Sequence, residues 1–267
     1  MSFDIDKFEN SVKQNGICYW DAREFMDSLD YTAWDSFLSV IRKAMASCTR
    51  ADLMPEDNFI RNDYIDSDGK SLANYKLTRF ACLLITMHAD DKKPKVAKAK
   101  VALSQVVDYV AAISENDLGR LEVRNDLKAA EQQMSDAAYI AGVDGVQFGI
   151  FKDAGFRGMY NMSLKDLKAH KGISEKITPY NVMGLTELAG NLFRVTQTAQ
   201  RIKSSNVSGL SAVSNTAREV GQEVRDMMIK NSGIAPEELP IEQNIDDIKK
   251  GIKSVAREFK KIDKPKK

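Results

Sequence analysis

The sequence predicts a predominantly α-helical protein of the α+β class, in which a small α+β domain precedes an all-α region. Short runs of β-branched and aromatic residues occur between turn signals before residue 78, and such runs favour strands. Beyond Val96, apolar residues recur every three or four positions over long stretches, which is the period of amphipathic helices. We therefore expect an α+β domain at residues 1–93, an all-α region at residues 94–263 and a solvated basic tail at residues 264–267.

Turn and capping residues define the elements of the first domain. Asp21 is a suitable N-cap, and Glu24 three positions later can complete a capping box. Asp68 and Gly69 stand between two strand-like runs and predict a hairpin, because a type I′ turn needs positive φ at its central residues. The expected elements are helices at residues 3–12, 22–29, 32–49 and 78–89, and strands at residues 17–20, 59–65 and 71–77.

The second region is expected to contain only helices. A long amphipathic helix runs from residue 96 toward residue 134, with a break near Gly119, and Ser163 caps a short helix. Three later helices carry apolar stripes of heptad-like period. The stripes are Leu188, Leu192, Val195, Ala199 and Ile202; Val213, Ala217, Val220, Val224 and Met227; and Ile245, Ile248, Ile252, Val255, Phe259 and Ile262. We expect the third stripe to pack on the second, and a homodimer through the third is the alternative.

The composition is that of an ordinary globular protein, with 43% hydrophobic and 29% charged residues. The net charge of +1 gives no global excess toward nucleic acid or membrane, so any electrostatic footprint must be local. No apolar run approaches the roughly 20 residues of a spanning helix. Three widely spaced cysteines and two histidines form no disulfide framework or metal-ligand spacing. We expect a cytoplasmic protein with no metal or cofactor.

Two stretches imitate known ligand loops without meeting their requirements. Gly69-Lys70-Ser71 resembles the end of a phosphate-binding loop, but Tyr64 stands where that loop needs its first glycine. The same stretch imitates a calcium loop, yet Tyr75 occupies the position of the bidentate glutamate. A hairpin turn explains these residues better.

No arrangement of nucleophile, base and orienting group is recognisable in the sequence. Asp21, Arg23 and Glu24 lie beside Trp20 and could be imagined as acid and base groups, but helix capping and surface ion pairs explain them better. We therefore predict a protein that is not an enzyme, and we keep a nuclease with a spatially assembled site as the least favoured alternative.

The densest basic cluster before the C-terminus is a candidate nucleic-acid-binding site. Five lysines occur within nine residues, on a loop and the helix start that follows it. Such a cluster can neutralise phosphates, although a solubilising linker would have the same composition. The lysines are Lys92, Lys93, Lys95, Lys98 and Lys100.

A second candidate is a row of polar residues opposite the apolar stripe of the helix that contains Leu188. These side chains suit phosphates, base edges or a protein groove, and they could equally be the solvated side of an amphipathic helix. The predicted partner-binding residues are Asn191, Arg194, Gln197, Thr198 and Arg201.

Blocks of sequence in a fixed order resemble one bacterial family, the DNA-damage-inducible protein D (DinD) family. The first block, around residues 19–37, also resembles the BRO-N domain of phage and viral antirepressor-like proteins. Thr78 stands where the family usually has serine, and residues 92–100 are more basic than the usual family loop. The blocks are Tyr19 to Phe25 with Leu29, Tyr31, Trp34 and Phe37; Lys43, Ala44 and Cys48; Tyr75 to Cys82; Phe151 to Gly155 with Gly158, Met159 and Tyr160; Lys171 to Ile173; Glu187 to Thr198; and Val220, Gly221, Val224 and Arg225 with Pro236 to Pro240.

This resemblance implies a non-enzymatic protein of the SOS response that binds and antagonises RecA–DNA filaments and so limits strand exchange. Its implied partner is a RecA-type recombinase filament, with direct contact to DNA as a further expectation. The alternative is a phage-type antirepressor or DNA-binding transcription regulator that acts through the N-terminal domain, with a phage repressor as its partner. No membrane partner is implied.

Overall fold

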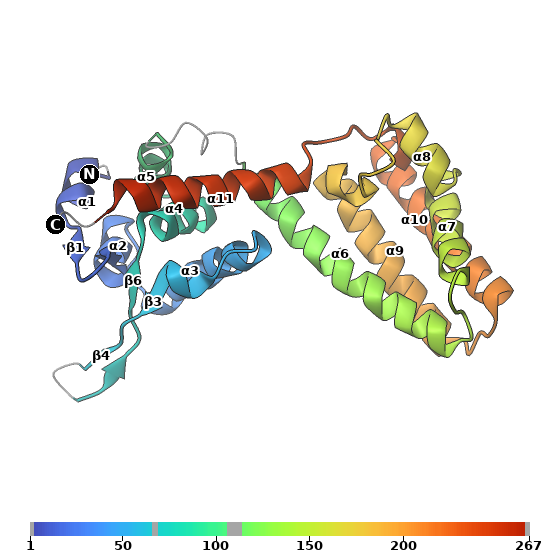
Figure 1. Cartoon of the computed structure of the whole chain (residues 1–267), viewed down its shortest axis with the longest axis horizontal. Helices are drawn as coiled ribbons and strands as arrows, with labels where there is room; N and C mark the ends of the chain where they lie inside the picture. Colours follow the sequence, from blue (N-terminus) through green and yellow to red (C-terminus); the bar gives the residue numbers. More distant parts are fainter. Residues whose placement is uncertain (1–2, 66–68, 106–113, 265–267) are drawn as a thin grey trace. The chain divides into compact units, whose positions relative to one another are not determined.

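The computed structural model describes residues 3–65, 69–105 and 114–264 (Figure 1). The chain divides into two compact units. Unit 1 consists of Met1–Leu118 together with Asp246–Lys267, and unit 2 is Gly119–Ile245. Eleven α-helices and a small sheet occur among the described residues, so the predicted α+β class with a predominance of helix is confirmed. The division between units falls after Leu118 instead of residue 93, and the last helix belongs with the N-terminal unit.

Unit 1 is built around a four-stranded antiparallel sheet with the order β1-β2-β6-β3. Leu77 of β6 is paired with Trp20 on one side and with Phe59 on the other. Its elements are α1 (Ile5–Asn10), β1 (Lys13–Gln14), β2 (Cys18–Asp21), α2 (Ala22–Ser28), α3 (Trp34–Arg50), β3 (Phe59–Arg61), β4 (Tyr64–Ile65), β5 (Ser71–Leu72), β6 (Tyr75–Leu77), α4 (Arg79–His88), α5 (Pro94–Ser104) and α11 (Ile245–Ile262).

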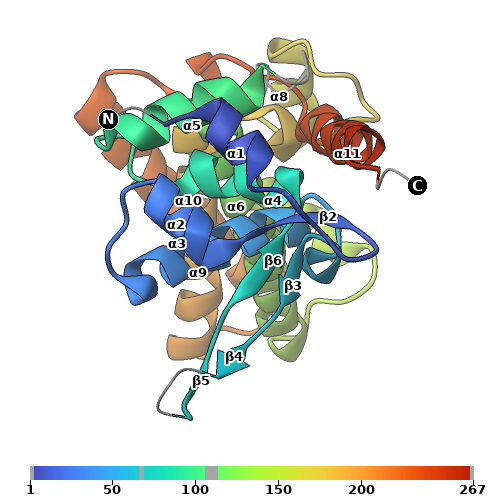
Figure 2. The ribbon, with the colours of Figure 1, turned by 90° about the vertical axis from the view of Figure 1, so that its left-hand side faces the viewer.

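The predicted hairpin is confirmed in the described residues. Strands β4 and β5 form a two-stranded ribbon that extends beyond the four-stranded sheet, as Figure 2 shows. Gly69 has a φ of 77°, a conformation that glycine adopts without steric cost. Asp68, the other residue of the predicted turn, lies outside the described residues.

The core of unit 1 gathers around α4, which the sequence predicted as a buried helix. Every residue of α4 from Arg79 to Met87 is buried. Trp20 is only 2% exposed, and its ring stacks on Phe8 with 4.6 Å between the ring centroids. The indole N–H of Trp20 donates to the carbonyl of Phe8 at 2.8 Å, so this buried polar group is satisfied.

The buried Arg79 joins three elements of unit 1. Its guanidinium donates to the carboxylate of Glu9 in α1 and, at 2.8 Å, to the carboxylate of Asp263 directly after α11. It also lies over the ring of Trp20, 4.8 Å from the centroid. Two carboxylates and an aromatic face compensate the desolvation of this charge, which would otherwise be costly.

The last helix, α11, does not pack on the partner that we predicted for it. We expected its apolar stripe to face the helix at residues 213–227, but it lies along α4 in unit 1 (Figures 1 and 2). Two of its lysines, Lys249 and Lys253, reach Asp52 of unit 1. The stripe at residues 213–227 is instead covered by other helices of unit 2, except for Met227, which is 42% exposed. Two stripes of equal period can each be buried, but the period does not specify which helix covers which.

Unit 2 is helical apart from one isolated bridge between Met183 and Ile241. Helix α10 packs mainly on α7 and also on α9. Ser163 caps α8 as predicted, since its hydroxyl accepts from the amide of Asp166 at 3.1 Å. The elements are α6 (Glu115–Ile140), α7 (Gln147–Tyr160), α8 (Leu164–His170), α9 (Leu185–Ser204) and α10 (Leu210–Ser232).

The long helix predicted from residue 96 is interrupted, but before the predicted position near Gly119. Helix α5 ends at Ser104 and α6 begins at Glu115, so Gly119 lies inside α6. Helix α6 begins at Glu115 through a capping box. The Ser114 hydroxyl accepts from the amide of Asp117, and the Asp117 carboxylate accepts from the amide of Ser114, each at 3.1 Å. Residues 106–113, which include the apolar residues Val106, Val110 and Ile113 of the predicted long helix, lie outside the described residues.

Helices α7 and α10 cross at glycines. A Cβ atom on Gly158 would clash with the backbone carbonyl of Arg218, and a Cβ on Gly221 would lie 2.6 Å from the carbonyl oxygen of Gly155. Because these positions lack side chains, the two backbones approach closely. The blocks that carry the family resemblance around Gly155 and Gly221 therefore meet in the core of unit 2.

Cys18, Cys48 and Cys82 are buried free thiols, in agreement with the expected absence of a disulfide. Among the residues that the structure describes, no helix has the length and hydropathy needed to cross a membrane.

Candidate functional site

The five lysines of the predicted nucleic-acid-binding cluster have different surroundings in the structure. Lys93 donates to the backbone carbonyl of Asp30 at 2.8 Å and lies over the ring of Tyr31. Lys95 makes an ion pair of 2.8 Å with the Asp30 carboxylate. The hydrogen bond from Lys95 holds the pKa of Asp30 below its ordinary value. Both lysines thus connect the start of α5 to the end of α2.

The other three lysines of the cluster have different surroundings. Lys100 is paired with Glu115 at the start of α6 and with Asp91. Lys92 and Lys98 are exposed, one before α5 and one on it. Three of the five lysines thus contact partners within unit 1, and Lys92 and Lys98 extend into solvent, so phosphate binding by this cluster stays a prediction.

The polar row on α9 was predicted as a partner-binding surface, and the structure corrects this. Asn191, Arg194 and Thr198 are at most 1% exposed. Of the remaining two, Gln197 is exposed, and Arg201 donates to both carboxylate oxygens of Glu223 on α10 at 2.8 and 2.6 Å. Helix α9 is covered on more than its apolar face, so polar residues opposite the stripe also enter the core.

These buried polar residues belong to a hydrogen-bonded network. The amide of Asn191 donates to the hydroxyl of Tyr160 at 2.7 Å, and that hydroxyl donates to the carboxylate of Glu187 at 3.0 Å. Lys171, with a side chain 3% exposed, pairs with Glu187 at 3.0 Å and donates to the carbonyl of Leu239. Burial raises the pKa of Glu187 and raises the pKa of Tyr160 well above its ordinary value.

Arg194 continues this network on its other side. Its guanidinium donates to the side-chain oxygen of Asn191 and to the hydroxyl of Tyr180, both at 3.1 Å. It also lies 5.1 Å from the ring centroid of Phe156 and fills the space beside Gly155. Every member has partners inside unit 2, so the network serves the fold of this unit.

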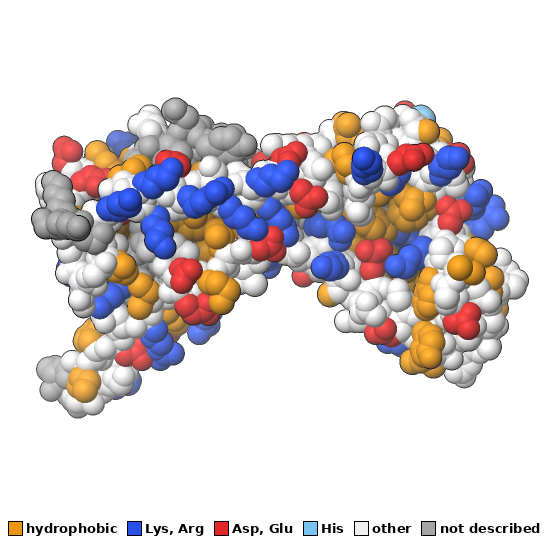
Figure 3. All heavy atoms as spheres, viewed as in Figure 1, with side chains coloured by type: hydrophobic (Ala, Val, Ile, Leu, Met, Phe, Trp, Pro, Cys, Tyr) orange, Lys and Arg blue, Asp and Glu red, His pale blue; other side chains and the backbone are white. Residues whose placement is uncertain are grey.

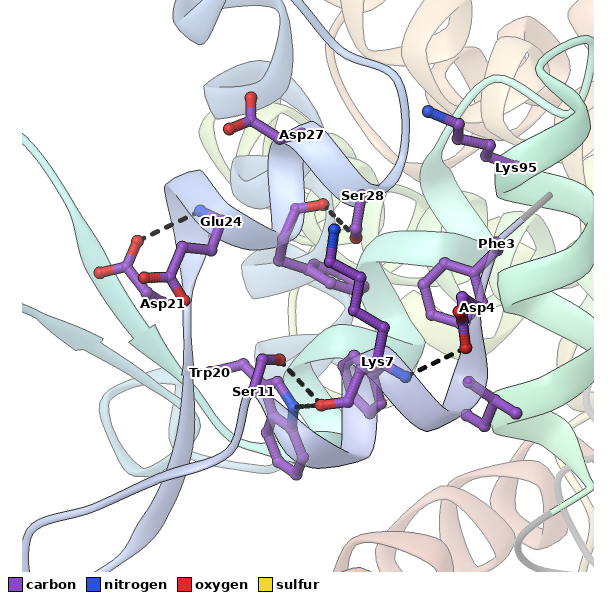
Figure 4. Close-up of a pocket in the computed structure, with 13 residues that line it drawn as sticks. Phe3, Asp4, Lys7, Ser11, Trp20, Asp21, Glu24, Asp27, Ser28 and Lys95 are labelled. Atoms are coloured by element: carbon purple, nitrogen blue, oxygen red, sulfur yellow. Dashed lines mark hydrogen bonds between the residues drawn. The ribbon is translucent and has the colours of Figure 1, made fainter. Parts of the chain in front are cut away.

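An open pocket of about 940 Å³ lies beside α1 and α2 (Figure 4). Asp21 caps α2, as predicted, by accepting from the amides of Arg23 and Glu24. Asp4 caps α1 in the same way by accepting from the amide of Lys7. Two of the carboxylates that line this pocket thus have a structural role as helix caps.

An apolar surface that the sequence analysis missed lies at the turn between α6 and α7. Four large apolar side chains here are 57–90% exposed, and we call this surface the α6–α7 apolar tip. Figure 3 shows hydrophobic side chains exposed over the end of α6 and the start of α7. Large contiguous apolar patches are a feature of interaction sites, which makes this surface a candidate. The sequence did contain a signal for this surface. Gly142 and Gly145 both have positive φ and form the turn that separates the apolar residues at the end of α6 from those at the start of α7. The residues are Tyr139, Ile140, Val146 and Ile150.

Comparison with known proteins adds two findings. The sequence model of the DinD C-terminal domain family matches residues 113–248 of the chain, which include all of unit 2. The chain is also similar to DNA damage-inducible protein D of Escherichia coli strain K12. The two are 31% identical over 245 residues, which cover 87% of this chain and 89% of the relative.

Proposed function

The chain belongs to the DinD family, and from this membership we propose that it acts in the DNA-damage response by binding and antagonising RecA–DNA filaments. The observation that carries the proposal is the length of the similarity. A relative named for its induction by DNA damage aligns with 87% of the chain, and an alignment of that length must extend into both compact units.

The α6–α7 apolar tip is the surface that we assign to the protein partner. It lies within the region that the family model matches. Ile140 and Val146 are 83% and 90% exposed, so their burial against a partner would remove apolar surface from water. We propose that a recombinase subunit of the filament covers this surface.

The direct test uses purified protein with RecA-coated and with naked single-stranded DNA. We expect the protein to lower the ATPase activity of the filament and to release or block RecA, while the protein alone hydrolyses no ATP. Filaments that stay intact and active at a stoichiometric amount of protein would contradict the proposal. Capture of a phage repressor by the protein, with filaments unaffected, would favour the antirepressor alternative.

A double variant tests the assigned surface. Ile140→Lys combined with Val146→Asp leaves the net charge unchanged while making the tip polar. The matched control is Met227→Lys combined with Ile234→Asp, because these residues are also exposed apolar residues of unit 2, at 42% and 46%. We expect the tip variant to bind filaments at least about tenfold more weakly, a loss of roughly 1.4 kcal/mol. Equal binding by the two variants would remove the tip from the proposal.

A further inference from the structure

We propose that the solvent face of α11 binds the phosphate backbone of nucleic acid. This goes beyond filament antagonism, because the proposed ligand is naked nucleic acid and the site lies on unit 1. We call this surface the α11 basic face. It consists of Lys249, Lys250, Lys253, Arg257, Lys260 and Lys261.

The six cations lie on one side of the helix. At 3.6 residues per turn they fall within an arc of about 120°, opposite the apolar stripe. Lys250, Arg257, Lys260 and Lys261 are exposed. From Lys250 to Lys261 the helix rises roughly 16 Å, a length over which one DNA strand presents about five phosphates. Figure 3 shows Lys and Arg side chains in a row along α11.

The surrounding carboxylates neutralise only part of this charge. Asp52 is shared between Lys249 and Lys253, at 3.5 and 3.2 Å. On the helix itself, Asp247 pairs with Lys250 and Glu258 pairs with Lys261. At least three carboxylates thus contact the six cations, and a further one, the exposed Asp246, lies on the same side of the helix. The two pairs on the helix are exposed ion pairs, which phosphates can replace at little cost.

The helix is held firmly enough to present this face in a fixed orientation. Five apolar residues on its opposite side are at most 3% exposed, and the carboxylate of Asp263 directly after the helix accepts hydrogen bonds from the buried Arg79. A rigid row of cations loses less conformational freedom when it binds than a flexible tail does. The five buried residues are Ile245, Ile248, Ile252, Val255 and Phe259.

Burial of the apolar side also selects the class of ligand. An amphipathic helix binds a membrane by inserting its apolar face, but the apolar face of α11 is already occupied by unit 1. What remains for a partner is a row of cations at the spacing of helix turns, which complements a polyanion with evenly spaced charges. Nucleic acid is the partner that fits, and the geometry by itself favours neither DNA nor RNA.

The test measures binding of the full-length protein to fluorescent single-stranded DNA, single-stranded RNA and duplex DNA between 50 and 200 mM salt. One variant changes the α11 basic face, and we call it the stripe variant after the row of cations that it interrupts. It replaces three exposed cations that do not contact Asp52, as Lys250→Gln, Arg257→Gln and Lys261→Gln together. The control variant carries Lys165→Gln, Lys203→Gln and Lys230→Gln, which removes the same charge from exposed positions of unit 2. Melting curves verify that all three proteins are folded.

We expect the stripe variant to bind at least about tenfold more weakly than the wild type at the lowest salt. Each lost phosphate contact should also flatten the slope of log affinity against log salt, by about 0.9 for duplex and 0.7 for single strands. The control should bind like the wild type. Three results would overturn the proposal: a wild type that binds none of the three nucleic acids, equal losses in both variants, or an unchanged salt slope. Binding of anionic lipid vesicles that the stripe variant loses, without nucleic-acid binding, would make the face a membrane contact instead.

The filament assay separates this proposal from the proposed function. If the protein leaves filaments intact but the stripe variant loses binding to naked DNA, only the filament proposal fails. If the wild type and the stripe variant antagonise filaments equally and bind naked DNA with the same affinity, only the α11 assignment fails.

Discussion

Arg194 is a cation placed where water cannot reach it. Its guanidinium has hydrogen-bond partners in Asn191 and Tyr180 and an aromatic neighbour in Phe156. The planar shape of the guanidinium lets one side chain meet all of these groups at once. A shorter side chain would leave two buried polar groups without a partner, and each such group costs about 1–3 kcal/mol.

We therefore expect Arg194→Ala to lower the free energy of unfolding by about 2–5 kcal/mol. Gln197→Ala, at an exposed position of the same helix, should change it by less than about 0.5 kcal/mol. Urea denaturation of both variants measures the difference. If Arg194→Ala were as stable as the wild type and had lost only partner binding, the arginine would be a contact residue, as the sequence analysis predicted.

Glu187 makes the stability of the chain depend on pH in a defined direction. Burial raises its pKa from an ordinary value of 4.5, although the ion pair with Lys171 and the hydrogen bond from Tyr160 oppose the shift. The native state therefore binds the proton more tightly than the unfolded state does. Its contribution to the free energy of unfolding must fall as the pH rises from 4.5 through the folded pKa, and must be constant at higher pH.

The variant Glu187→Gln cannot titrate at this position and isolates the effect. We expect the stability of the wild type relative to this variant to decrease with rising pH across that window and then to level off. Urea denaturation of both proteins at a series of pH values from 4.5 upward gives the comparison. A relative stability that increases with pH would mean that the pairing with Lys171 outweighs burial and lowers the pKa of Glu187.

At the level of single residues, the sequence identified polar side chains of interest but not their surroundings. The period of the α9 stripe predicts the apolar face and says nothing about a second covering on the other side. That covering comes from residues distant in sequence, such as Tyr160 and Tyr180, which approach Asn191 and Arg194 only in the folded unit. The cap at Asp21 was predictable because its partners are two and three residues away.

Among the helices, the crossing of α7 and α10 offers a matched pair of glycines. A Cβ on Gly158 would meet the backbone of Arg218, which has no freedom to move aside, whereas a Cβ on Gly149 in the same helix would have no atom within 4 Å. The two positions share helix and backbone conformation and differ in what surrounds them.

The substitution Gly158→Ala should separate α7 from α10 and destabilise the protein by about 1–3 kcal/mol or more. Gly149→Ala should instead stabilise it by up to about 1 kcal/mol, since alanine is the better helix former and meets no neighbour. Thermal melting of both variants measures the opposite signs. Destabilisation by both, or by neither, would mean that the close approach of the two helices is not what Gly158 provides.

Most elements were predictable because their signals are local. The structure agrees to within a few residues with the expected bounds of helices α2, α3 and α4. Strands β3 and β6 also lie within the two strand segments expected on either side of the turn. Caps, turn residues and hydrophobic period act over short distances, which is why these elements were predictable. The partner of α11 was not predictable in this way. The apolar stripe of α11 has the same period as that of α10, so the period cannot decide which helix covers it. Its packing on unit 1 includes ion pairs with Asp52 and Arg79, which lie far from α11 in the sequence.

For the whole molecule, the two units have separate cores, and the chain passes between them twice. It crosses once in the first turn of α6, after Leu118, and once at the start of α11, after Ile245. The C-terminal helix thus completes the unit in which the chain began. Proteins built from more than one unit commonly depart from two-state unfolding, so each unit should unfold as its own cooperative block.

Two single variants test this independence by calorimetry. Phe259→Ala removes a ring of α11 that is 1% exposed in unit 1, which should cost about 3–5 kcal/mol. Gly158→Ala acts on the crossing of α7 and α10 in unit 2. We expect two overlapping transitions in the wild type, of which Phe259→Ala lowers one, by roughly 10 °C, and Gly158→Ala lowers the other. Because the substituted residues belong to different cores, the double variant should show both shifts, with additive effects. A single transition that both variants lower together would mean that the two units unfold as one block, so that α11 transmits the stability of unit 1 to unit 2.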